Sequence, residues 1–234
     1  MTRYISLDTE TTGLKLFHGV QPFAVTTCDE EGITKLWEWE VDPVTRQVMA
    51  PEEELTELVD YVDGATLVFH NAKFDIRALK NIGIRLVFQN PKQFWATETY
   101  EDHTHEAFIN GFEDTLLASH VCNSEEPHGL KFLSEKYLDI VDDDEQELLD
   151  AVRSARREGK TREWNLGEKV PCDYWLPKAV DPESEVLATY AVQDVVRTML
   201  LWMMYQKVLD EEGLRSQYDM RKALVPITYR MEEF

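Results

Sequence analysis

The sequence predicts a mixed α/β fold, in which one sheet is flanked by helices. Three closely spaced apolar strands open the chain, and later strands alternate with amphipathic helices, which is the pattern of a mixed sheet. With 234 residues, 43% of them hydrophobic, the chain is long enough to bury one sizeable core. We therefore expect one domain, or one domain plus an appendage.

The first half of the chain supplies the strands and two helices. Strands are expected at residues 4–7, 23–28 and 33–39, the last two joined by the turn DEEG. A helix is predicted over 51–62, where a proline and three acids precede apolar residues spaced i, i+3, i+4. The short buried strand ATLVFHN (65–71) is followed by a helix in FDIRALKNIGI, which ends near Gly83.

Helices dominate the second half. GFEDTLLASHVCN (111–123) favours a strand end and then a helix, and residues 129–140 favour another helix. Between 141 and 182 the pattern loosens. The acidic run there lacks the glycine and the final glutamate of an EF-hand, so a helix N-terminus is favoured, and 165–182 is expected to be a loop. A long amphipathic helix over 183–209 and a final helix over 214–234 complete the prediction.

The charge balance is strongly acidic, with 45 acids against 24 bases and a net charge of −21. This balance argues against a nucleic-acid partner unless metal ions and a local basic patch carry the contact. One basic cluster is present, for which a solvated helix face is favoured over a phosphate contact. Its members are Arg153, Arg156, Arg157, Lys160 and Arg162.

Other features place the protein in a reducing, aqueous compartment. No run of about 18 apolar residues occurs, and MTRYISLD lacks the layout of a signal peptide, so we expect no membrane partner and a cytoplasmic location. Cys28, Cys122 and Cys172 form no CxxC pair and are expected to be buried thiols. His103 and His105 lack a third ligand at zinc spacing, so a surface loop is expected there.

Carboxylates at three places in the chain could together carry chemistry. Asp8 and Glu10 share one face of the first strand at its end, and Asp75 follows the strand at 65–71. Asp194 lies in the mostly apolar stretch LATYAVQDVVRTMLLWMM, with Tyr190 one turn earlier on the same face, and a buried aspartate needs a partner. Four carboxylates suit Mg²⁺ or Mn²⁺, and can hold two ions about 3.5–4 Å apart for phosphodiester hydrolysis.

Three stretches also resemble a known family. LDTETTGL, HNAKFDIRALKNIGI and YAVQDVVRT resemble, in that order, the three motifs of the DEDD (DnaQ-like) 3′→5′ exonucleases. The resemblance covers essentially the whole chain and is greatest to the proofreading domain of phage and bacterial family-A DNA polymerases, because EDTLLASHVCNSEEPHGLKFLSEKYL is similar to their stretch between the second and third motifs. The YxxxD spacing at Tyr190 is that of the tyrosine subtype, and Thr189 stands where the histidine subtype carries its histidine.

The resemblance implies a ribonuclease H-like sheet and a two-metal catalytic site. In it Asp8, Glu10 and Asp194 would hold one Mg²⁺ (or Mn²⁺), and Asp8 and Asp75 would position a second. Tyr190 would orient the attacking water, because a phenol with a pKa of about 10 is a poor base at neutral pH. For Leu14 and Phe74 ordinary core packing stays open as an alternative. The implied substrate path comprises Thr9, Thr12, Gly13, Leu14, Asn71 and Phe74.

We therefore expect a metal-dependent 3′→5′ exonuclease that removes nucleoside monophosphates from single-stranded DNA 3′ ends, as in replication proofreading in a bacterial or phage-infected cell. Residues 1–212 would form the exonuclease domain, and 213–234 a helix leading into a polymerase domain, so that a polymerase is the expected partner. Two alternatives stay open. One is a catalytically idle exonuclease fold that docks on a polymerase, and the other is an exonuclease that trims RNA 3′ ends.

Overall fold

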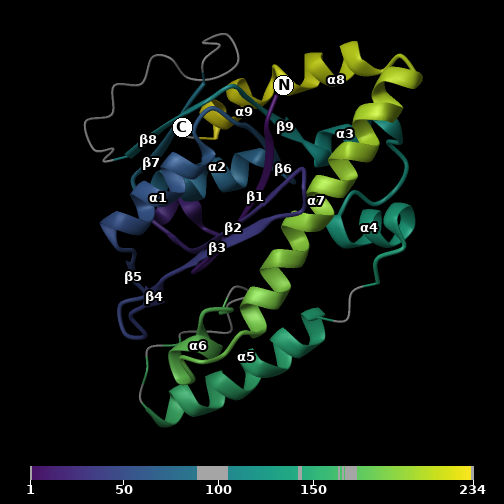
Figure 1. Cartoon of the computed structure of the whole chain (residues 1–234). Coiled ribbons are helices and arrows are strands. Elements are labelled where there is room, and N and C mark those ends of the chain that lie inside the picture. Colours follow the sequence, from purple (N-terminus) through teal and green to yellow (C-terminus); the bar gives the residue numbers. More distant parts are fainter. Residues whose placement is uncertain are drawn as a thin grey trace.

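The computed structural model describes residues 2–88, 105–141, 144–162, 164, 166 and 173–232, and it confirms the mixed α/β class (Figure 1). The strands in chain order are β1 (Tyr4–Thr11), β2 (Pro22–Asp29), β3 (Thr34–Glu38), β4 (Glu40–Val41), β5 (Val48–Met49), β6 (Thr66–Phe69), β7 (Ile84–Phe88), β8 (His105–Ile109) and β9 (Gly111–Asp114). The helices are η1 (Leu16–His18), α1 (Glu52–Val62), α2 (Ala72–Asn81), α3 (Thr115–Cys122), α4 (Leu130–Leu138), α5 (Asp144–Thr161), α6 (Leu176–Val180), α7 (Val186–Glu211), α8 (Arg215–Lys222) and α9 (Val225–Met231).

The central sheet has five strands in the order β3-β2-β1-β6-β9. β1, β2 and β3 form the predicted antiparallel meander, and β6 and β9 continue the sheet parallel to β1. β1 reaches Thr11, beyond its predicted end at residue 7, because its ladder with β2 pairs Asp8 with Thr26 and Glu10 with Ala24. The two acids therefore lie inside the strand rather than past it, and the sheet fixes their backbone.

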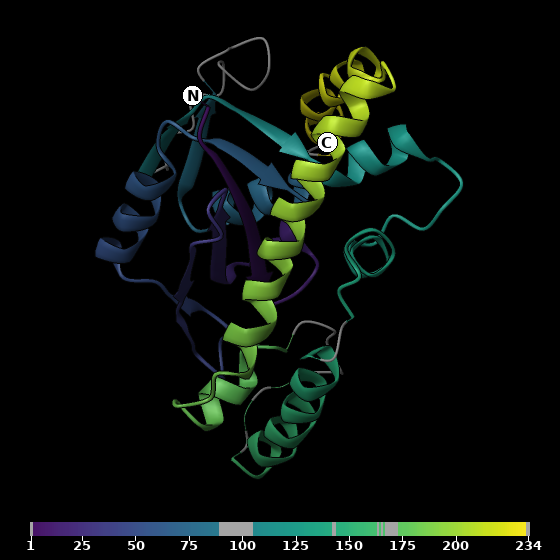
Figure 2. The same cartoon turned by 45° about the vertical axis from the view of Figure 1, so that its right-hand side comes forward.

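The long helix α7 crosses one face of this sheet, as both views show (Figures 1 and 2). It is tied to β1 by Ser6, whose hydroxyl donates a hydrogen bond to the carbonyl of Val195 at 2.7 Å. Further along, Trp202 and Tyr205 of α7 pack with Tyr218 of α8 in a buried cluster. α7 thus spans from the sheet to the C-terminal helices.

Three parts of the fold differ from the prediction. The two-stranded sheets β4-β5 and β7-β8 were not predicted, and α6 lies in a segment predicted to be a loop. The predicted final helix is two helices, because Pro226 has no amide hydrogen to continue α8 and instead starts α9. The expected surface loop at His105 is wrong: this residue is buried at the start of β8, with Nε2 3.2 Å from Glu52 Oε1.

Several remaining predictions concern single residues. Cys28 is buried as expected and Cys122 is half-buried, whereas Cys172 and His103 lie outside the described residues. No helix in the described part of the chain is long and apolar enough to cross a membrane.

Candidate active site

Carboxylates from β1 and α7 meet on the face of the sheet that α7 covers. Side-chain oxygens of Asp8, Glu10 and Asp194 all lie within 4.8 Å of one another. Alternation along β1 turns Asp8 and Glu10 to this face, and α7 turns the buried Asp194 toward them. The structure thus brings together three of the predicted acids from opposite ends of the chain.

Three acids this close repel one another and are poorly solvated. Burial, and secondarily the Asp194 carboxylate, raises the pKa of Asp8 to about 7. Burial also raises the pKa of Glu10 well above its usual value, and repulsion from Asp8 and Asp194 adds to the rise. Arg197, one turn along α7, offsets part of the charge, since its Nη1 donates to Asp194 Oδ1 at 2.9 Å. It is a partner of the kind that a buried aspartate requires.

All the potential metal ligands of this cluster are carboxylate oxygens. Hard divalent cations such as Mg²⁺ and Mn²⁺ prefer carboxylate oxygens, and a cation would relieve the repulsion that raises the pKa values of Asp8 and Glu10. The three acids therefore fit a divalent cation.

Asp75, the fourth predicted acid, is buried in the first turn of α2 and does not belong to the cluster of three. Its Oδ1 accepts hydrogen bonds from the amide of Thr9 at 3.0 Å and from the Thr9 hydroxyl at 2.8 Å. Burial raises the pKa of Asp75 well above its usual value, and repulsion from Asp8 raises it further. Asp75 is thus held beside the cluster, with Thr9 between the two acids of β1.

The entry of α2 is set by Asp114, a residue that the sequence analysis did not select. Asn71 before the helix adopts a left-handed conformation with φ 85°. Its amide donates to Asp114 Oδ1 at 3.2 Å, and the amide of Ala72 donates to Asp114 Oδ2 at 2.9 Å. Asp114 also caps α3 by accepting from the Leu116 amide at 2.9 Å. Its position immediately before an apolar helical stretch is a cap signal that could have identified it.

Tyr190 lies one turn before Asp194 and is 8% exposed. Its ring packs edge-on against Tyr174, with 5.6 Å between centroids, and Lys131 Nζ of α4 lies 4.8 Å from its centroid. Burial, followed by the charge of Asp194, raises the pKa of Tyr190 far above its usual value, so the phenol keeps its proton. Lys131 lies in the stretch similar to the family between its second and third motifs, but it was not selected as a site residue. It also lies close enough to Glu10 to lower the pKa of that carboxyl in part.

The predicted substrate path divides into buried and exposed residues. Thr12 and Gly13 are buried, and the Thr12 amide donates to the carbonyl of Gln21 at 3.0 Å. Leu14, by contrast, is 60% exposed, so the core-packing alternative is wrong for it. Leu14, Asn71 and the half-buried Phe74 line a common pocket.

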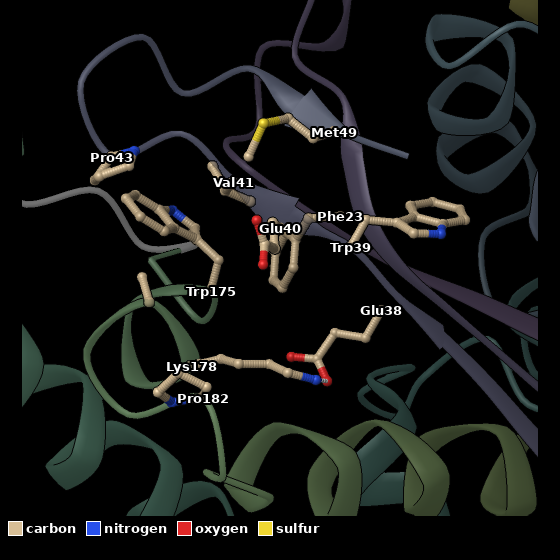
Figure 3. A pocket seen from close by; sticks show the side chains of 11 residues that line it. Phe23, Glu38, Trp39, Glu40, Val41, Pro43, Met49, Trp175, Lys178 and Pro182 are labelled. Atoms are coloured by element: carbon tan, nitrogen blue, oxygen red, sulfur yellow. Dashed lines mark hydrogen bonds and ion pairs between the residues drawn. The ribbon is translucent and has the colours of Figure 1, made fainter. Parts of the chain in front are cut away.

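A separate cavity of about 280 Å³ lies between the start of β2, β4 and α6 (Figure 3). Phe23, Trp39 and Trp175 form apolar walls, and the ion pair of Lys178 with Glu38 lies at one side. None of the predicted site residues lines this cavity. The acidic cluster and the pocket at Leu14 therefore remain the candidate site.

Four residues of the predicted basic cluster lie on α5, and Arg162 directly follows the helix. Arg153 pairs with Asp150 and Arg162 with Glu158, both with exposed side chains, as expected of a solvated helix face. Arg156 departs from that expectation, because its side chain is only 14% exposed and pairs with the buried Asp173.

Comparison with solved structures supports the fold. NrnC of Brucella melitensis with bound Mg²⁺ superposes with a TM-score of 0.60 at 17% identity, covering 99% of this chain and 86% of that one. NrnC bound to pGG gives 0.61 at 18% identity, covering 99% and 85%. A structure described as the apo form of the nuclease gives 0.62 at 18% identity, covering 98% and 84%. These similarities establish the ribonuclease H-like fold.

No curated protein sequence matches the chain significantly. The model of a 3′-5′ exonuclease family, however, matches residues 1–210, a span that contains all four acids, Tyr190 and the sheet. The geometry of β1 and α7 and this match over most of the chain lead to one conclusion. The chain belongs to the 3′-5′ exonuclease family.

Proposed function

We propose that the chain is a divalent-metal-dependent 3′→5′ exonuclease that removes nucleoside monophosphates from single-stranded DNA 3′ ends. Membership of the family makes it a nuclease. The observation that carries the proposal is the cluster of Asp8, Glu10 and Asp194, whose side-chain oxygens lie within 4.8 Å of one another, with the buried Asp75 beside it. Such a concentration of buried and half-buried acids costs stability and has a purpose if it binds cations.

In this proposal the acids have distinct roles. Asp8, Glu10 and Asp194 would hold one Mg²⁺ or Mn²⁺, and Asp8 and Asp75 would hold a second, as two-metal phosphodiester hydrolysis requires. When bound, such ions activate water and neutralise charge on the phosphate. Thr9 keeps Asp75 in place through its two hydrogen bonds.

Tyr190 orients the attacking water as a hydrogen-bond donor and not as a base. Burial raises its pKa, so the phenol carries its proton throughout the range in which the enzyme would act. The terminal nucleotides lie along Thr12 and Gly13 and in the pocket at Leu14, Asn71 and Phe74.

A second candidate substrate is RNA. The observation that favours it is the similarity to NrnC bound to pGG. A catalytically idle docking module is less favoured, because docking requires neither the four acids nor a buried tyrosine beside them.

The test uses 5′-labelled single-stranded DNA and RNA of one sequence, incubated with Mg²⁺, with Mn²⁺ or with excess chelator. We expect a ladder that shortens from the 3′ end and releases mononucleotides, only when metal is present. The ratio of kcat/KM for DNA to that for RNA shows which of the two is the preferred substrate. Full activity in chelator would refute the metal mechanism, and degradation of RNA alone would replace the DNA substrate.

Proofreading for a polymerase is the finer proposal, with a polymerase as partner in the cytoplasm. It requires that a 3′-mismatched primer on a template be shortened faster than a matched one, because mismatched ends fray into single strand. Equal rates on the two ends would contradict proofreading and leave the exonuclease activity standing.

A further inference from the structure

A pocket of about 240 Å³ lies between η1, α2 and α9. Its walls bring the Leu14 and Asn71 region together with the last described helix, and both views show α9 near the body formed by α2 and the sheet (Figures 1 and 2). Its remaining lining residues are Leu16, Phe17, Lys73, Phe74, Arg77, Tyr229 and Glu232. Residues 225–232 therefore form part of the candidate site.

Arg77 holds α9 in this place. Its guanidinium carbon lies 4.0 Å from the ring centroid of Tyr229 and 4.6 Å from that of Phe17, and the residue is only 8% exposed. A guanidinium stacked between two rings is a rigid arrangement with a permanent positive charge. Arg77 therefore links α2 to η1 and to α9 at the wall of the pocket.

Lys73 lies at the more open side of the pocket and pairs with Glu232. The two side chains are 31% and 46% exposed, and an exposed ion pair of this kind contributes little stability. An incoming phosphate can therefore displace the Glu232 carboxylate. Lys73 lines this pocket together with Leu14, Asn71 and Phe74, the residues at which the proposed function places the terminal nucleotides.

We propose that Lys73 binds the backbone phosphate next to the scissile one, and that Glu232 of α9 competes with this phosphate for Lys73. The proposal rests on the proposed exonuclease function. In a chain with a net charge of −21, a strand reaching the acidic cluster needs a local cation, and Lys73 supplies one in this pocket. Glu232 then sets how tightly the strand is held, so α9 tunes substrate affinity.

The experiment compares two substrates. One is a 5′-labelled trinucleotide, made of DNA or RNA according to which of the two the wild-type protein degrades. The other is the p-nitrophenyl ester of a nucleoside 5′-monophosphate, which has no second phosphate. The variants are Lys73→Gln, Glu232→Gln and the double variant. Lys80→Gln is the matched control, because Lys80 lies on the same helix but does not line the pocket.

We expect Lys73→Gln to raise KM for the trinucleotide about tenfold with little change in kcat, and to leave hydrolysis of the ester unchanged. The slope of log kcat/KM against log salt should fall by about 0.7, the value for one lost phosphate contact on a single strand. Glu232→Gln should lower KM severalfold, which no misfolded variant would do. In the double variant the Glu232 substitution should have no further effect, and Lys80→Gln should behave as wild type.

An unchanged KM in Lys73→Gln, or an equal loss on both substrates, would overturn the proposal. So would an unchanged KM in Glu232→Gln. A wild-type protein that hydrolyses neither substrate would instead refute the proposed function, so the two failures are distinguishable.

Discussion

Asp75 is bound twice by Thr9, whose amide and hydroxyl donate to the same carboxylate oxygen at 3.0 and 2.8 Å. Thr9 lies between Asp8 and Glu10 on β1, so one strand fixes three of the four acids. The backbone bond is available to any residue at position 9, whereas the hydroxyl bond requires serine or threonine.

Thr9→Val tests this relationship, because valine keeps the shape of threonine and loses only the hydroxyl. We expect kcat to fall by about 10- to 150-fold and half-saturation with Mg²⁺ to move to higher concentration, since a lost hydrogen bond to a charged group is worth roughly 1.5–3 kcal/mol. Magnesium titrations of the rate measure both. Thr27→Val is the control, because the buried Thr27 hydroxyl has no hydrogen-bond partner among the described residues. An unchanged rate in Thr9→Val would show that the backbone bond alone is sufficient.

Asp8→Ala should remove nearly all turnover, because Asp8 is assigned to both cations. Asp75→Ala and Asp194→Ala should each cost several orders of magnitude in kcat, because each is assigned to one of the two cations, whereas the exposed Glu53→Gln on α1 should be silent. Single-turnover degradation of labelled DNA measures each rate. If Asp8→Ala kept more than about a tenth of the wild-type rate, equivalent to about 1.4 kcal/mol, the assignment would be wrong.

Tyr190→Phe should keep the fold and metal binding but lose the orienting hydroxyl. We expect the rate to fall by roughly ten- to a thousand-fold, which is milder than Asp8→Ala. Because burial raises the pKa of Tyr190, the wild-type rate should show no step owed to the phenol between pH 6 and 10. Tyr205→Phe is the control on the same helix, since its buried hydroxyl has no hydrogen-bond partner in the described part of the chain. A silent Tyr190→Phe would make Tyr190 a packing residue.

The stability of the fold should depend on pH through His70. Burial lowers the pKa of this histidine from 6.5 to about 4, and its Nδ1 lies 2.8 Å from Thr115 Oγ1. Between these values the unfolded chain binds a proton that the folded chain does not. The contribution of the neutral His70 to the free energy of unfolding is therefore complete above about pH 6.5. It is lost as the pH falls toward 4, and the total loss is about 3 kcal/mol.

The raised pKa values of Asp8, Glu10 and Asp75 change the free energy of unfolding in the opposite direction. The folded chain binds protons at these acids more tightly than the unfolded chain does, so they stabilise the fold as the pH falls. The comparison must therefore be between wild type and His70→Gln, by urea unfolding at pH 4, 5, 6 and 7. The difference in unfolding free energy should narrow as the pH falls. A difference that is constant with pH would contradict a neutral buried His70.

The sheet and its acids were predictable because their signals are local. β1, β2 and β3 were expected from apolar runs and a turn, and Asp194 from an acidic residue in a mostly apolar helix. The same charge argument required a partner for Asp194, and a candidate, Arg197, was visible three residues later. The roles of these residues in catalysis stay predictions, as does the domain boundary after residue 212.

What could not be predicted depends on contacts between distant segments. β7 and β8 pair Ile84 with His105 across an intervening stretch. In neither strand do apolar and polar residues alternate strongly enough to predict a strand from the sequence. Asp114 joins α2 to α3, and its amide bonds to Tyr218 of α8 at 2.9 Å, which only the folded chain reveals. Lys131 reaches Tyr190 in the same way, from a helix whose sequence looks like an ordinary surface.

α7 is one unbroken rod of 26 residues, about 39 Å long, with Asp194 in its first half and Trp202 in its second. The position of Asp194 therefore depends on the aromatic packing of Trp202, which lies roughly 12 Å further along the same helix. Any substitution that lets this distal end shift, Trp202→Ala above all, would displace the Asp194 carboxylate without touching the acidic cluster. Substitutions in the hydrophobic core would then weaken the affinity for Mg²⁺ before they unfold the protein. A titration with Mg²⁺ would therefore detect loosened core packing in a protein that is still folded.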